Sequence, residues 1–102
     1  MEPLMRLGKE KPVVIFAKSN CGISYAIQSL IISFGANPTI YNLDQHPQGR
    51  EIENALLGLG CNPSAPAVFI GKLFVGGANE VMSLNLKGKL KPLLINAGAI
   101  WM

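Results

Sequence analysis

Cys21 is the residue of this sequence that is best placed to do chemistry. A short polar stretch separates Cys21 from the apolar run of residues 13–17, and a segment with helical periodicity begins directly after Cys21. The first N–H groups of a helix and the helix dipole stabilise an anion, and Lys18 adds a positive charge on the same turn. Both effects lower the pKa of a thiol, so we expect a nucleophilic thiolate. The alternative is a cysteine that only packs at the start of the helix.

Two other residues could take part in chemistry but have poorer surroundings. Cys61 follows Gly60 at the end of an expected helix, and we expect its thiol to be buried or inert. His46 lies in a polar connection, and no other residue stands at a metal-ligand spacing from it, so zinc is not indicated.

The composition describes one small domain over residues 1–102. Nine Lys plus Arg face six Asp plus Glu, and 49% of the residues are hydrophobic. This length allows one core of two or three layers and excludes a TIM barrel. A net charge of +3 is too small to indicate nucleic-acid binding. No apolar run approaches the roughly 20 residues that span a membrane, and we expect no secretion signal and reduced cysteines.

The elements that position Cys21 follow from hydrophobic patterning. Apolar runs predict buried strands at 13–17 and 66–70, a shorter strand at 39–43, and a fourth strand at 73–75 behind a Gly71-Lys72 turn. Helical spacing predicts helices over 22–34, 51–59, 78–86 and 90–97, with a short one inside 1–10. This order predicts an α/β protein with a thioredoxin fold, in which helices flank a mixed four-stranded sheet.

Three short segments carry a resemblance to a known family. They read Lys18-Ser-Asn-Cys-Gly-Ile-Ser24, Ser64-Ala-Pro66 and Val75-Gly-Gly-Ala-Asn-Glu80. Together they resemble the active site, the cis-proline loop and the Gly-Gly turn of glutaredoxins. Residues 50–63 and the ending Gly98-Ala-Ile-Trp-Met102 are similar to the plant CC-type glutaredoxins. CC-type members usually carry a second cysteine where this chain has Gly22, and the string Cys21, Gly22, Ile23, Ser24 resembles a monothiol active site instead.

The resemblance implies a glutathione-dependent thiol-disulfide oxidoreductase that removes glutathione from mixed disulfides. Cys21 would be the catalytic nucleophile. Because Ser24 stands where a second cysteine could lie, a second glutathione would release the bound glutathionyl group. The implied glutathione-binding residues are Lys18, Ala65, Pro66 in cis, and the backbone of Gly77, Ala78 and Asn79. Taken singly, these residues also fit a solvated lysine, a strand-start proline and an ordinary turn.

The resemblance leaves two alternatives open. CC-type glutaredoxins are associated with TGA-type bZIP transcription factors and co-repressors, which implies a nuclear adaptor with weak catalysis. Its partner-binding residues would be Leu90, Leu93, Leu94, Ala99, Ile100, Trp101 and Met102, although the spacing of the leucines also fits a helix core. The monothiol string implies a carrier whose [2Fe-2S] cluster is ligated by Cys21 of two chains and two glutathione thiols. We expect a protein of the cytoplasm and nucleus that contacts neither nucleic acid nor membrane, and that is monomeric unless a cluster bridges two copies.

Overall fold

A four-stranded sheet forms the centre of the computed structural model, which describes residues 11–18, 22–58 and 66–100. The strands are β1 (Val13–Ala17), β2 (Thr39–Asn42), β3 (Ala67–Ile70) and β4 (Leu73–Gly76), in the order β2-β1-β3-β4. β1 pairs in parallel with β2 and antiparallel with β3, and β4 runs antiparallel to β3. This is the mixed sheet that the sequence predicts. The helix expected inside residues 1–10 lies outside the described residues.

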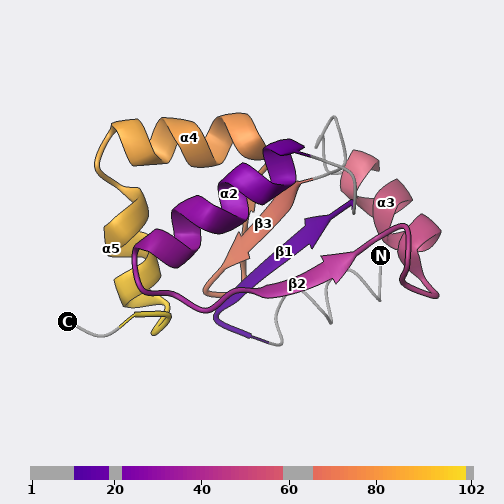
Figure 1. Cartoon of the computed structure of the whole chain (residues 1–102), viewed down its shortest axis with the longest axis horizontal. Coiled ribbons are helices and arrows are strands. Elements are labelled where there is room, and N and C mark those ends of the chain that lie inside the picture. The colour runs from indigo at the N-terminus through magenta and orange to yellow at the C-terminus, as the bar shows by residue number, and fades with distance from the viewer. Residues whose placement is uncertain (1–10, 19–21, 59–65, 101–102) are drawn as a thin grey trace.

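Four helices cover this sheet in the described part of the chain. They are α2 (Gly22–Ser33), α3 (Gly49–Gly58), α4 (Ala78–Leu86) and α5 (Leu90–Asn96). In Figure 1, α2 and α4 cross one face of the sheet and α5 follows α4 at the left, while α3 lies apart from them at the right. The arrangement is a thioredoxin-type fold, as predicted.

The two central strands are buried on both faces because their apolar residues are continuous. Val13, Ile15 and Ala17 of β1 face the cluster formed with α2, α4 and α5, whereas Val14 and Phe16 face α3. Alternation of side chains along a strand produces this division. The helices contribute buried side chains to both clusters, which are Ile27, Ile31, Val81, Leu90 and Leu94 on the first face and Ile52 and Leu56 on the second.

The β3–β4 hairpin is closed by Gly71 and Lys72, as predicted. Their φ angles are +59° and +73°, the left-handed backbone that a two-residue hairpin turn requires. Glycine adopts this conformation without a steric cost, and Lys72 is the non-glycine residue of the described chain that does so. The turn therefore holds β4 at the edge of the sheet.

Helix α3 begins at Gly49, two residues before the start that the sequence predicts, so the assignment of Gly49 to a polar connection was wrong. A Cβ atom at this position would lie 1.8 Å from the backbone oxygen of Leu43. The first turn of α3 thus packs directly on the chain that leaves β2. Only glycine permits this approach, and a glycine in a polar stretch reads as a turn in the sequence.

Candidate functional site

Three segments that are distant in the sequence meet at one end of the sheet. Lys18 follows the last residue of β1, and Pro66 precedes the first residue of β3. Phe16 pairs with Ala67, so these two positions lie at the same end of the neighbouring strands. Val68 pairs with Gly76, which brings the end of β4 and the following Gly77 to this end as well. The register thus gathers three of the predicted glutathione-binding positions.

Two helices also begin at this end of the sheet. α2 starts at Gly22, directly after Cys21, and α4 starts at Ala78. The first N–H groups of a helix have no acceptor within the helix and favour an anion. The side chains of Ile23 and Tyr25 are 59% and 71% exposed, whereas Ser24 is buried. The first turn of α2 therefore exposes the side chains of Ile23 and Tyr25.

Lys18 forms an ion pair that the sequence did not suggest. Its Nζ lies 2.5 Å from Oε2 of Glu53 in α3, and the two side chains are 47% and 31% exposed. At such exposure an ion pair contributes up to about 1 kcal/mol to stability. A carboxylate of the chain itself therefore already pairs with the ammonium group of Lys18, and the binding of glutathione by Lys18 stays a prediction.

The start of α4 is also bonded to a side chain of its own helix. The backbone N–H of Gly77 donates to Oε1 of Glu80 at 2.7 Å. The Glu80 side chain folds over the turn and lies close to Gly76. A Cβ atom on Gly76 would lie only 2.7 to 2.9 Å from atoms of the Glu80 side chain. Gly76 has a φ angle of +131°, a conformation that favours glycine. Because the Gly77 N–H already donates to Glu80, the backbone N–H groups of Ala78 and Asn79 are the ones in this turn that are best placed to donate to an external carboxylate.

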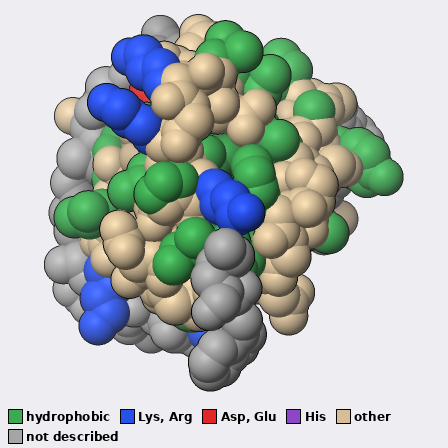
Figure 2. Space-filling view, turned by 90° about the vertical axis from the view of Figure 1, so that its left-hand side faces the viewer, with side chains coloured by type: hydrophobic (Ala, Val, Ile, Leu, Met, Phe, Trp, Pro, Cys, Tyr) green, Lys and Arg blue, Asp and Glu red, His purple; other side chains and the backbone are tan. Residues whose placement is uncertain are grey.

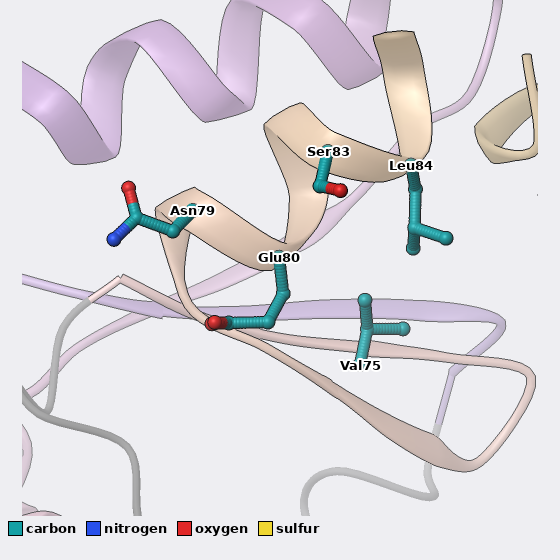
Figure 3. A pocket seen from close by; sticks show the side chains of 5 residues that line it. All are labelled: Val75, Asn79, Glu80, Ser83 and Leu84. Carbon is teal, nitrogen blue, oxygen red and sulfur yellow. The ribbon is translucent and has the colours of Figure 1, made fainter. Parts of the chain in front are cut away.

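A shallow pocket of about 500 Å³ lies beside this turn. Val75 and Leu84 form its apolar wall, and Asn79, Glu80 and Ser83 are its polar lining. Figure 3 shows the carboxylate of Glu80 at the turn between β4 and α4, whereas Asn79 points away from Val75 and Leu84. The pocket is therefore on the flank of α4 and β4, next to the predicted carboxylate-binding turn.

Pro66 is buried and immediately precedes β3, and its role in binding glutathione stays a prediction. Its cis conformation stays a prediction. Several predicted residues lie outside the described chain: the nucleophile and possible cluster ligand Cys21, the glutathione-binding Ala65, and the partner-binding Trp101 and Met102. Within residues 11–18, 22–58 and 66–100, no three His, Cys, Asp or Glu side chains are grouped as they would be around a metal ion.

Most of the segment assigned to partner binding packs into the core. Leu90, Leu94 and Ile100 are buried in the cluster with α2 and β1, and Leu93 and Ala99 pack against it. This is the packing that the helical spacing of the leucines also allowed. Partner binding by these residues stays a prediction, and their side chains would have to leave the core to contact a partner.

The end of the molecule at α5 exposes lysines and scattered apolar side chains. Leu86 is 85% exposed, and Lys87, Lys89 and Lys91 are all exposed. Figure 2 shows several small hydrophobic groups on this face, separated by polar atoms and lysines. The hydrophobic side chains of the described residues do not merge into one large patch in this view. No helix of the described chain is long and apolar enough to cross a membrane.

The fold and the gathered residues define a thioredoxin-type protein with its candidate site at the carboxyl end of β1. Residues 13–75 match the family model "Glutaredoxin". The chain is 56% identical to "Monothiol glutaredoxin-S6" of Arabidopsis thaliana over 101 residues, which cover 99% of both chains. It is 55% identical to "Monothiol glutaredoxin-S5" of the same plant over the full length of both. The chain belongs to the glutaredoxin family, and its predicted resemblance to plant CC-type glutaredoxins is confirmed.

Solved glutaredoxin structures have the same fold. A buckwheat glutaredoxin–glutathione complex superposes with a TM-score of 0.91 and 35% identity, covering 98% of this chain and 91% of that chain. The holo form of glutaredoxin C1 from Populus tremula x tremuloides gives a TM-score of 0.87 and 30% identity, covering 94% and 95%. The similarity therefore extends over nearly the whole of each molecule.

Proposed function

We propose that this protein is a monothiol oxidoreductase that uses glutathione to reduce glutathione mixed disulfides through Cys21. The observation that carries the proposal is the meeting of Lys18, Pro66 and the Gly76–Gly77 turn at the end of the sheet where α2 and α4 begin. Further support comes from family membership and from the relative whose structure is described as a glutathione complex.

The chemistry needs one protein thiolate and two molecules of glutathione. The Cys21 thiolate attacks the glutathionyl sulfur of the mixed disulfide, a new S–S bond forms, and the substrate leaves as a thiolate that takes up a proton. The thiolate of a second glutathione then attacks the glutathionyl sulfur on Cys21, which restores the Cys21 thiolate and releases glutathione disulfide. Ser24 is buried in the first turn of α2 and provides no second thiol.

The residues around Cys21 would orient the glutathionyl group. One carboxylate of glutathione would approach Lys18, and the other would accept from the N–H groups of Ala78 and Asn79 at the start of α4. Held at both ends, the tripeptide would present its sulfur to Cys21 in one orientation, and orientation of this kind accelerates exchange.

A mixed-disulfide assay tests the function directly. We expect purified protein to turn over a glutathionylated peptide with glutathione as reductant, and Cys21→Ser to have no turnover. Cys61→Ser is the matched control, because it makes the same change at a cysteine with no proposed role, and it should keep wild-type turnover. Turnover of the wild type no greater than that of Cys21→Ser would refute the proposal.

We further propose that the protein works in the cytoplasm and nucleus, on or with TGA-type bZIP transcription factors. The CC-type resemblance supports this partner class, and glutathione maintains reduced thiols in these compartments. Truncation from Gly98 would be a poor test because it also removes the core residue Ile100. We expect Trp101→Ala to reduce co-precipitation with such a factor while leaving the thermal midpoint unchanged, and unchanged co-precipitation would contradict the proposal.

A further inference from the structure

We propose that Glu53 is a specificity-determining residue that weakens the binding of glutathione by occupying the ammonium group of Lys18. This inference rests on the proposed function, since it concerns the same site. The two side chains form a direct ion pair, with 2.5 Å between Nζ of Lys18 and Oε2 of Glu53. Any ligand carboxylate that approaches Lys18 therefore meets a carboxylate already in place.

The position of Glu53 is fixed by the packing of its helix. Ile52 and Leu56 of α3 are fully buried in the cluster beneath the sheet, and Gly49 anchors the first turn on Leu43. Glu53 follows Ile52 and is only 31% exposed, so the helix directs it toward the end of β1. The carboxylate is thus held near Lys18 by the core and not only by the ion pair.

The electrostatic consequence is that the Lys18–Glu53 pair has no net charge. The ammonium of a lysine has three N–H donors, so it can donate to a second carboxylate as well as to Glu53. That second carboxylate would lie close to the first, and like charges at this separation oppose each other. The two side chains are 47% and 31% exposed. Solvent therefore screens the repulsion, and the expected effect on affinity is about 2- to 5-fold.

The matching prediction concerns ligand class. A thiol substrate with a neutral group at this end loses nothing to Glu53, whereas glutathione, with its carboxylate, does. Glu53 therefore reduces the preference of the Cys21 site for glutathione over smaller neutral thiols. Replacement of Glu53 by glutamine keeps the shape of the side chain and removes the charge, so it should restore the preference for glutathione.

Thiol-disulfide exchange measures this preference. Wild type, Glu53→Gln and Glu51→Gln are equilibrated with glutathione disulfide and glutathione, and separately with hydroxyethyl disulfide and mercaptoethanol. In each case the Cys21 thiolate attacks one sulfur, the S–S bond of the reagent breaks, and one thiolate leaves. Intact mass and peptide mapping give the fraction of Cys21 modified. The ratio of the two equilibrium constants removes any change in the reactivity of the thiol itself.

Glu51→Gln is the matched control because Glu51 is an exposed residue of the same helix and loses the same charge. We expect Glu53→Gln to raise the ratio about 2- to 5-fold over wild type and Glu51→Gln to change it less than twofold. The increase should shrink at high salt, and it should disappear with the disulfide of glutathione diethyl ester, which lacks the carboxylates. A purely structural role for Glu53 would lower the thermal midpoint without raising the ratio.

The outcomes separate the inference from the function on which it rests. If wild type turns over glutathione mixed disulfides and Glu53→Gln has the ratio of Glu51→Gln, the inference is overturned and the function stands. If neither wild type nor either variant favours glutathione over the neutral reagent, and wild type has no turnover, the inference and the proposed function are both overturned. Wild-type turnover together with a ratio that rises in Glu53→Gln and not in Glu51→Gln supports both.

Discussion

Replacement of Gly49 by alanine should disrupt the attachment of α3 more than any surface change to that helix. The added Cβ would lie 1.8 Å from the backbone oxygen of Leu43, about 1.2 Å inside the 3.0 Å below which such contacts are essentially never seen. It would also lie 2.8 Å from the Leu43 carbonyl carbon. These are backbone atoms, which cannot rotate aside as a side chain can, so α3 itself must shift.

The size of the effect follows from overpacking. Extra atoms in a packed interior cost about 1–3 kcal/mol, and more where the neighbour cannot move. We therefore expect Gly49→Ala to lower the free energy of unfolding by at least about 3 kcal/mol. For a chain of this size, 1 kcal/mol corresponds to roughly 4–8 °C in the thermal midpoint, so the midpoint should fall by at least about 12 °C.

Gly58→Ala provides a matched control at the other end of α3. No atom lies within 4 Å of a Cβ built there, so the same substitution meets open space. Alanine is the better helix former, and we expect the midpoint of this variant to be unchanged or slightly raised. Circular dichroism during heating and urea titration would measure both variants. A midpoint for Gly49→Ala within about 4 °C of wild type would refute the packing argument. Failure of Gly49→Ala, and not of Gly58→Ala, to give soluble folded protein would support the argument, as the most severe destabilisation.

Further predictions concern α4, α5 and the end of the described chain. Glu80→Ala removes the acceptor of the Gly77 N–H and should lower the free energy of unfolding, measured by urea titration, by about 1 kcal/mol. An unchanged free energy of unfolding would show that this hydrogen bond contributes little. Leu94→Ala should cost about 2–5 kcal/mol because Leu94 is fully buried, whereas Leu86→Ala should stay within about 0.5 kcal/mol because Leu86 is 85% exposed. Ile100→Ala should cost about 2 kcal/mol in the same titration, and unchanged stability together with weaker co-precipitation of a bZIP factor would favour a partner-binding role for Ile100 over a core role.

The order of the elements could be predicted because their sequence signals are local. The apolar run of β1 and the Gly71-Lys72 turn each specify one conformation within a few residues, and both were confirmed. Gly35, at a φ angle of +91°, follows the end of α2 as expected. The start of α3 was misplaced because the requirement at Gly49 comes from Leu43 packing against it. A contact of that kind leaves no periodic pattern in the sequence.

The site was predictable where it depends on the ends of strands and helices. Lys18, Pro66 and Gly77 were assigned to one site through the resemblance to glutaredoxins, and the order of the elements places them near the ends of strands and the start of a helix. Glu53 could not be assigned to this site, because it lies on a predicted amphipathic helix where a glutamate is an ordinary solvent-facing residue. Its ion pair joins α3 to Lys18, which follows β1 and is far from Glu53 in the sequence. The charge state of the site thus depends on tertiary packing.

The central position of β1 affects the synthesis of the protein. β1 is made before β3, and one edge of β1 is covered only by β3, which begins at Ala67. Until those residues leave the ribosome, the nascent chain has an apolar strand with an open hydrogen-bonding edge, which is a template for association with other chains. A stable sheet must await synthesis of the second half, so fragments that end before β3 should aggregate and not fold.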